Sequence, residues 1–418
     1  MKRGFLKTEK ASGARSRSFN NLNLTTSVVP LQNAPFNFSP FSRVISRDPY
    51  IVEADDRLRG SDSVQFLFFP SNIPTSVFVD TLKNIHTFEK WINQAQRTPP
   101  PNSAAPAFAI RGCAGKGLGV FAQRAIRRGE LIMAERPVYV SRPGISTIAN
   151  SGEAFYESAL AGLSPDAQRS VLALRNAQPP DNGVGAILGR LHTNALVAKP
   201  PFDPSARYLA LFPNLCRLNH DCTPNSHYSF SSETFTGRIL AVRAIEEGEE
   251  LTLGYVDLVA PRDARRVGLR EKYHFECTCP TCELPEEKLL VSDAKRRVIA
   301  AYFARLGGGT KIPADASLEE VKQLIKHAED DGLVEALSIL VVSALRLAKK
   351  AKNHHEEIKY VVDGVNWMRI LEGNDAPGFC VMAKRLGMEP EELVEVFDCG
   401  EPIDYARFKE LLERGRKE

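Results

Sequence analysis

Short apolar runs separated by polar residues and glycines extend from residue 108 to residue 140. Because this segment has no sustained 3.6-residue repeat, it predicts several short strands. Gly115, Gly117 and Gly119 lie in the first turn between them. Dinucleotide-binding loops share this glycine spacing, but such a loop leads directly into a helix, whereas the residues that follow here, GVFAQRAI, alternate like a strand. We therefore expect a β region and not a dinucleotide-binding fold.

A second β region is predicted after residue 225. Residues 226–235 and 238–243 have the pattern of a hairpin that turns at Thr236 and Gly237. The turn sequence EEGEE and the apolar strand LTLGYV follow it.

Helical periodicity occurs in two places. Residues 155–197 form a helical insert between the two β regions, with Ser164 and Pro165 as the cap and first position of one helix. From about residue 285 to the end the spacing is helical again, with a capping box at Ser317 and Glu320. Pro390 opens a further helix there. The C-terminal third is therefore expected to be an all-helical lobe.

The first hundred residues have a different character. Residues 1–47 are basic and contain one acidic residue, which predicts disorder and is also compatible with a mitochondrial presequence. Residues 78–92 have the spacing of one amphipathic helix, and the proline-rich segment 97–107 reads as a linker. The folded core is expected to begin near Phe108. The predicted division is an N-terminal extension over 1–104, a β domain over 105–260 with its insert at about 145–200, a cysteine-rich segment over 261–285, and a helical domain over 286–418.

Composition narrows the function only slightly. The chain has 418 residues, of which 43% are hydrophobic and 25% charged, as in ordinary globular proteins. A formal net charge of +3 does not indicate adsorption of the whole molecule to nucleic acid or to a membrane. The long apolar stretch 333–347 contains Glu335 and Arg346, so it predicts a buried helix and not a membrane span.

The cysteines carry the strongest chemical signal. Three thiols stand close together in FECTCPTC, at Cys277, Cys279 and Cys282, and Cys222 lies about 55 residues upstream. Four thiolates satisfy a tetrahedral zinc ion, and thiols crowded in this way fit a metal in a reducing compartment better than disulfides. The alternative, four ordinary thiols, fits this spacing poorly. A zinc-dependent nucleic-acid binder is disfavoured because acidic side chains surround the triplet and would repel phosphate. These acidic residues are Glu276, Glu283, Glu286 and Glu287.

Five segments, in this order, resemble the SET-domain protein lysine methyltransferases. They are AGKGLGVFA, RLHTNAL, LFPNLCRLNHDCTPN, EEGEELTLGYVDL and YHFECTCPTC, and together they extend over about residues 108–282. With a helical insert and a helical lobe, the chain is most similar to the SMYD branch and to related fungal-type SET proteins. It departs from that branch in one respect: no cysteine lies between Cys113 and Cys216, so the MYND zinc finger is absent.

The resemblance implies a fold class and a reaction. The fold is α+β: a SET-domain β fold of short strands with a helical insert, a post-SET zinc flap with four cysteines, and an all-helical C-terminal lobe. The reaction is transfer of a methyl group from S-adenosyl-L-methionine to a lysine amine, with Tyr255 as the catalytic residue and no His or carboxylate general base. The implied cofactor-binding residues are Ala114, Lys116, Gly117, Asn194, Leu218, Asn219, His220, Tyr255 and Phe275. The implied zinc ligands are Cys222, Cys277, Cys279 and Cys282.

Three of these residues also have a purely structural interpretation. His220 is compatible with a core histidine, Tyr255 with a strand aromatic, and Asn194 with a residue that caps or turns the chain after a helix. A SET fold kept as an inactive scaffold in a chromatin or other complex is the competing function. As an enzyme, the chain is expected to act as a monomer on a histone or non-histone protein. Its expected location is the nucleus, the cytoplasm or both, with the mitochondrion a lesser alternative.

Overall fold

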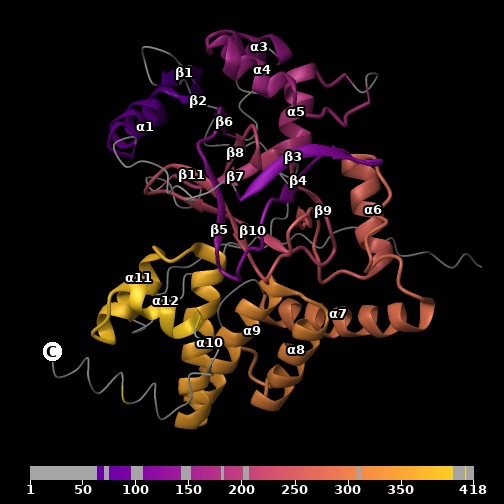
Figure 1. Cartoon of the computed structure of the whole chain (residues 1–418), viewed down its shortest axis with the longest axis vertical. Helices are drawn as coiled ribbons and strands as arrows, with labels where there is room; N and C mark the ends of the chain where they lie inside the picture. Colours follow the sequence, from indigo (N-terminus) through magenta and orange to yellow (C-terminus); the bar gives the residue numbers. More distant parts are fainter. Residues whose placement is uncertain are drawn as a thin grey trace, which may run out of the picture.

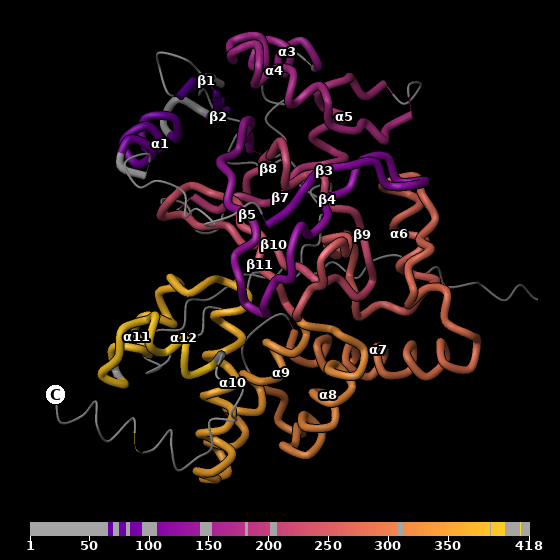
Figure 2. Tube along the Cα trace, viewed as in Figure 1, coloured from indigo at the N-terminus to yellow at the C-terminus, as the bar shows by residue number. Residues whose placement is uncertain are grey.

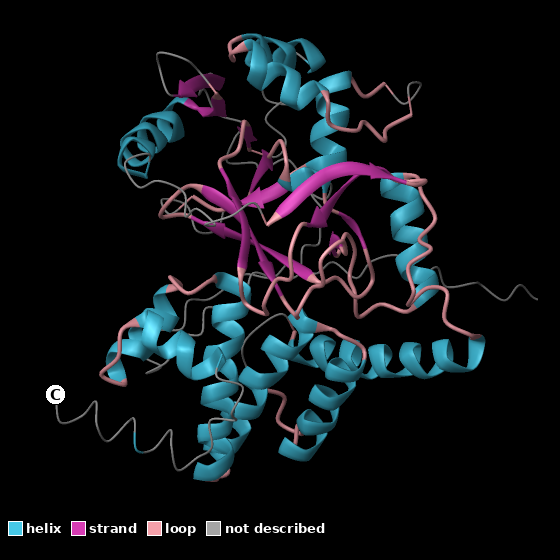
Figure 3. Ribbon diagram, viewed as in Figure 1, coloured by secondary structure: helices cyan, strands magenta, loops and turns pink. Residues whose placement is uncertain are grey.

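Small β-sheets form the centre of the computed structural model, and helices surround them (Figure 1). The structure describes residues 64–69, 75–95, 107–142, 152–179, 183–200, 207–307, 312–398 and 410. Figure 3 shows the strands gathered in the middle, with one group of helices at the top and a larger group at the bottom. This arrangement confirms the predicted α+β class.

Three sheets contain the described strands. One has the order β1-β2-β6-β8-β7, the second β10-β11-β5, and the third β3-β4-β12-β9. The predicted run of short strands between residues 108 and 140 is confirmed. The strands are β1 Val64–Phe69, β2 Ser76–Thr81, β3 Phe108–Cys113, β4 Gly117–Ala122, β5 Leu131–Glu135, β6 Tyr139–Ser141, β7 Leu196–Ala198, β8 Tyr208–Leu211, β9 Asn219–His220, β10 Ser226–Ser231, β11 Thr236–Ala241 and β12 Glu250–Leu253.

The folded core begins before Phe108, so the predicted boundary is wrong. Strand β2 pairs in parallel with β6 and antiparallel with β1, and helix α1 (Leu82–Ala95) follows it directly. The helix predicted over 78–92 is therefore a strand in its first residues. Phe78 is fully buried and its ring stacks on Phe88 of α1 at a centroid distance of 3.8 Å. Figure 2 shows this indigo segment beside the insert, although the sequence separates them. Residues 1–47 and most of the predicted linker lie outside the described residues, so the predictions made for them stay predictions.

Three helices make up the insert. They are α3 (Gly152–Ala161), α4 (Pro165–Leu172) and α5 (Ala186–Asn194). As predicted, the Ser164 side chain accepts a hydrogen bond from an amide of the first turn of α4, and Pro165 begins that helix. The carboxylate of Glu153 accepts hydrogen bonds from the first amides of α5, at 3.2 Å from that of Leu188. The insert is thus held together at its helix ends.

The hairpin turns earlier than predicted. Thr236 and Gly237 lie within β11, and residues 232–235 make the connection. Phe235 has a φ of 53° and a fully buried ring, which makes edge contacts with Phe88 and Trp91. Burial of this aromatic ring compensates for an unfavourable backbone conformation and fixes the turn before Thr236.

The C-terminal lobe is helical, as predicted. Ser317 caps its second helix by accepting a hydrogen bond from the Glu320 amide, and Pro390 begins its last described helix. Among the described helices, none combines the length and apolarity needed to cross a bilayer. The helices are α6 Arg262–Tyr273, which precedes the lobe, and α7 Glu286–Leu306, α8 Leu318–Asp330, α9 Val334–Lys350, α10 His354–Glu372, α11 Pro377–Arg385 and α12 Pro390–Asp398.

The lobe contacts the β domain through paired side chains. Arg238 of β11 makes a two-pronged ion pair with Asp375, with both N–O distances at 2.5 Å. The Arg128 guanidinium lies 4.5 Å from the ring centroid of Trp367 on α10. Arg238 is almost completely buried. The two parts are therefore joined by specific charge and cation–π contacts.

Candidate functional site

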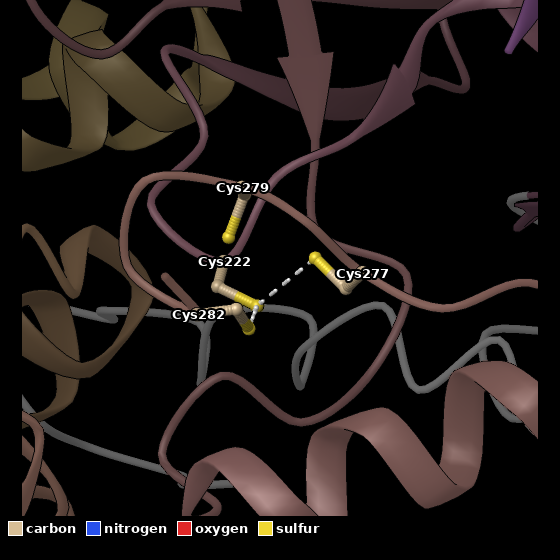
Figure 4. A group of neighbouring side chains, drawn as sticks. All are labelled: Cys222, Cys277, Cys279 and Cys282. Atoms are coloured by element: carbon tan, nitrogen blue, oxygen red, sulfur yellow. Dashed lines mark hydrogen bonds between the residues drawn. The ribbon is translucent and has the colours of Figure 1, made fainter. Parts of the chain in front are cut away.

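The four predicted cysteine ligands come together. Figure 4 shows the sulfur atoms of the segment 277–282 facing that of Cys222, which comes from a second segment. All four Sγ atoms lie within 4.8 Å of one another and the four residues are buried. Sγ of Cys222 is 4.0 Å from that of Cys277 and 3.6 Å from that of Cys282. Zinc–thiolate bonds of about 2.3 Å give a tetrahedron with edges of about 3.8 Å, so the cluster has the spacing of a structural zinc site.

Two nitrogen donors face the sulfur of Cys222. Nε of Arg265 donates to this sulfur at 3.2 Å, and Nε2 of His220 lies 3.4 Å from it. Four thiolates around one Zn²⁺ would carry a net negative charge, which the buried Arg265 guanidinium would partly offset. Hydrogen bonding among the thiols already raises the pKa of Cys222 and lowers that of Cys282. The surroundings therefore favour thiolate in part of the cluster.

The NH dipeptide is positioned by a parallel strand pair. Asn219 and His220 form β9, which pairs with Thr252 and Leu253 of β12. Asn225 fastens the loop that follows, because its Oδ1 accepts from the Thr252 amide at 2.9 Å. Two segments distant in sequence are thereby held in register, and β9 leads directly to Cys222 of the cysteine cluster.

Tyr255 lies two residues after the end of β12 and contacts both His220 and Leu218, the residue before this dipeptide. Its backbone amide donates to Nδ1 of His220 at 3.0 Å, and its hydroxyl donates to the Leu218 carbonyl. Its ring centroid is 5.0 Å from that of Tyr273. The Phe275 ring lies 6.3 Å from the His220 ring. The structure thus brings His220, Tyr255, Tyr273 and Phe275 into one aromatic group beside the cysteines.

A polar group lies beside this aromatic group. Nδ2 of Asn219 donates to Oε1 of Glu250 at 2.7 Å, and Nζ of Lys116 lies 2.8 Å from Oε2 of the same carboxylate. Burial favours a lower pKa for Lys116, but the hydrogen bond and charge of Glu250 outweigh it, so the net shift is upward. Lys116 is therefore a cation here. Ala114 precedes it in the exposed turn, and Gly117 has a φ of +84°, which glycine adopts without strain.

Asn194 takes part in a separate set of contacts. Its Nδ2 donates to the carbonyls of Arg175 and Arg190, at 2.7 and 2.8 Å. Cys216, which stands where the family resemblance leads one to expect a small Ser or Ala, is buried and donates to the Asn194 carbonyl at 3.2 Å. The Asn194 side chain therefore braces the insert, and a cofactor contact by it stays a prediction.

Sequence reasoning missed three residues of this site. Glu250 appeared only as part of a turn, Arg265 stands in a strongly charged helix that suggests exposure, and Asn225 ends the segment DCTPN. A period-4 pattern of Arg265, Leu269 and Tyr273 does mark the buried side of α6. No local signal distinguishes Glu250 from its neighbour Glu249.

Comparisons with known proteins place a SET domain in this part of the chain. Residues 117–256 match the family described as SET domain. The histone-lysine N-methyltransferase set5 of Schizosaccharomyces pombe is 28% identical over 271 residues, which are 64% of this chain and 80% of that protein. Human histone-lysine N-methyltransferase SMYD1 is 30% identical over 158 residues, or 35% of this chain and 29% of that protein. Mouse SMYD3 is 40% identical over 79 residues, or 19% of this chain and 18% of that protein.

The chain thus matches most of set5 but less than a third of either SMYD protein. The matched SET residues contain β4, β9, β12 and Tyr255, which build the site described above. The helical lobe and the four-cysteine cluster complete the predicted arrangement. This chain therefore contains a SET domain and is similar to SET-domain protein-lysine methyltransferases, SMYD proteins among them.

Proposed function

We propose that this protein transfers a methyl group from S-adenosyl-L-methionine to the side-chain amine of a lysine in a protein substrate. The observation that carries the proposal is the convergence of Asn219, His220 and Tyr255 beside the cysteine cluster. S-adenosyl-L-methionine supplies a methyl group on a sulfonium, which is reactive without further activation. The protein then has to align the amine and keep water out.

The polar end of the site suits the amino-acid part of this cofactor. Lys116 offers a cationic donor for a carboxylate, and Asn219 offers an amide oxygen for an ammonium group. Phe275 and His220 present rings against which an adenine can pack. Zn²⁺ held by the four thiolates would fix the segment of Phe275 against the β domain.

Tyr255 is proposed as the catalytic residue. A lysine amine with a pKa near 10.4 is neutral in about one molecule in a thousand at pH 7.4. Aromatic surroundings and the positive charge of the cofactor's sulfonium disfavour the ammonium form of the lysine and lower this pKa. The Tyr255 hydroxyl, held by the Leu218 carbonyl, is a fixed polar group in otherwise aromatic surroundings and can orient the neutral amine. No described residue is assigned as a general base.

The test incubates the purified protein and S-adenosyl-L-methionine with a labelled methyl group in an extract from cells that lack the protein, and measures labelled protein. Tyr255→Phe should lower transfer by about 100-fold, since a misplaced reacting group costs about that much. Cofactor affinity, measured by calorimetric titration, should change little. Tyr228→Phe is the matched control. The Tyr228 hydroxyl also donates to a backbone carbonyl, that of Val197 at 3.0 Å, but Tyr228 lies in β10 and not beside the cysteine cluster. Equal transfer by wild type and Tyr255→Phe would contradict this role.

The same titration distinguishes the enzyme from an inactive scaffold. A scaffold would bind no cofactor and label no protein. As an enzyme, the chain is proposed to act on a histone or a non-histone protein, in the nucleus, the cytoplasm or both. The relatives whose names specify histone lysine make a histone the first substrate to try.

A further inference from the structure

One carboxylate joins the two groups that face the cofactor's amino-acid end. Oε1 of Glu250 accepts from Nδ2 of Asn219 at 2.7 Å, and Oε2 accepts from Nζ of Lys116 at 2.8 Å. The Cys113 thiol donates to Oε1 as well, at 3.5 Å. Glu250 begins β12, so its backbone is fixed by pairing with Phe121 of β4. The contacts therefore originate from a rigid position.

These contacts decide which way the Asn219 amide faces. Nδ2 also donates to the Leu118 carbonyl, at 3.2 Å. A primary amide has two N–H donors, and both are directed at acceptors here. The flipped orientation would place Oδ1 against a carboxylate and a carbonyl, which cannot donate to it. Oδ1 therefore faces the opposite side, where it can accept from a donor such as an ammonium group.

The space around this pair is small. A Cβ atom at Gly119 would lie 3.0 Å from Nδ2 of Asn219 and 3.0 Å from Oε1 of Glu250. Only glycine at position 119 leaves the amide and the carboxylate in hydrogen-bonding contact without displacing one of them. Lys116 is placed by a second contact, since its backbone amide donates to the Cys113 carbonyl at 3.0 Å. Its ammonium retains donors beyond the one that Glu250 accepts.

We propose that Glu250 is a positioning residue, which orients Asn219 toward the ammonium and Lys116 toward the carboxylate of the cofactor's amino-acid end. This inference rests on the proposed function. Its physical basis is pre-organisation: without Glu250, the amide is free to turn and the Lys116 chain to swing, and the cofactor has to order both on binding. Glu250 thus acts through other residues and need not touch the cofactor itself.

The experiment compares two neutral thioethers by calorimetric titration of the full chain. S-adenosylhomocysteine carries the amino-acid end, and 5′-methylthioadenosine lacks it but keeps the adenosine and the sulfur. Glu250→Gln should weaken binding of S-adenosylhomocysteine by about tenfold, the effect of one charged hydrogen bond. Binding of 5′-methylthioadenosine should stay within about twofold. Glu247→Gln, at an exposed carboxylate of the same turn, is the control and should change neither.

Each outcome bears on one claim. If wild type does not bind S-adenosylhomocysteine, the proposed function fails, and this inference with it. If wild type binds but Glu250→Gln weakens both ligands equally, or neither, Glu250 has no selective role and only this inference fails. Tighter binding of S-adenosylhomocysteine by Glu250→Gln would show that Glu250 competes with the ligand for Lys116. That result would also overturn this inference. Should Glu250→Gln not fold, Glu250→Asp, which retracts the carboxylate by one carbon, is expected to show the same selective loss.

Discussion

The Tyr255 backbone amide donates a hydrogen bond to Nδ1 of His220, over an N–N distance of 3.0 Å. Because Nδ1 accepts, the neutral imidazole carries its proton on Nε2, which lies 3.4 Å from the Cys222 sulfur. The imidazole therefore bridges the cysteine cluster and the residue proposed for catalysis. We therefore expect a change in the cluster to affect the position of the Tyr255 backbone through this one ring.

Replacing His220 should therefore lower both the affinity for zinc and the rate of methyl transfer. His220→Phe keeps a ring but removes both nitrogens. Loss of the donor to Cys222 should weaken zinc binding by about tenfold, as for other residues that contact metal ligands. Methyl transfer should fall as well, since Tyr255 loses an acceptor for its amide. Chelator competition measures the first effect and the labelled assay the second. His274→Asn is the control, because His274 is exposed and Asn tolerates its positive φ of 56°. Unchanged zinc affinity in His220→Phe would disprove the bridge.

Removal of zinc should release the flap that carries Phe275. A zinc ion bound by the cluster would join Cys222 of the β domain to Cys277, Cys279 and Cys282, and these metal–sulfur bonds are lost when the ion is removed. A strong chelator should extract about one zinc per chain and abolish cofactor binding, and zinc should restore it. Cys279→Ser should behave like the chelated protein, whereas Cys380→Ser, outside the cluster, should not. A metal-free protein that binds cofactor normally would contradict this account.

The sequence predicts those features that depend on local pattern. Strand alternation near Phe108, the Ser164 cap and the spacing of Cys277, Cys279 and Cys282 are set within a few residues, and the structure confirms each. Strand β2 was missed because its residues also satisfy a helical period, and its pairing with β6 joins residues about 60 positions apart. The burial of Arg265 was missed for a similar reason. Its charge suggests exposure until the sulfurs from other segments are placed around it.

Asp375 should matter for stability more than an ordinary surface carboxylate. Its partner Arg238 has only 4% of its side chain exposed, so Asp375→Asn leaves a buried charge incompletely paired. Because Asp375 itself is half exposed, we expect a loss of about 2 kcal/mol in the free energy of unfolding, below the range for fully buried pairs. Urea denaturation measures the loss. Asp330→Asn, which removes one of the two carboxylate partners of Lys295 at the surface, should cost clearly less than Asp375→Asn. Equal losses in the two variants would show that burial of Arg238 is not decisive.

The pH dependence of stability should carry a contribution from His192. Burial, with a smaller effect from the Lys272 charge, lowers the pKa of this α5 histidine from 6.5 to about 4. In the unfolded chain the imidazole takes up a proton near pH 6.5, but in the folded chain only near pH 4. Between these values the unfolded state binds more protons, so the stabilising contribution is present above pH 6.5 and is lost as the pH falls from 6.5 to 4.

Replacing His192 by Gln should remove this part of the acid sensitivity. The thiol ligands and carboxylates also titrate on acidification, so the informative quantity is the difference between variant and wild type. The free energy of unfolding of each protein is measured at pH 7 and at pH 4.5. Its decrease between these values should be about 1–2 kcal/mol smaller for the variant than for wild type, after allowance for solvent screening. His354→Gln is the control, because 77% of the His354 side chain is exposed. If the stability of wild type and His192→Gln falls in parallel between pH 7 and 4.5, His192 is not held neutral by burial.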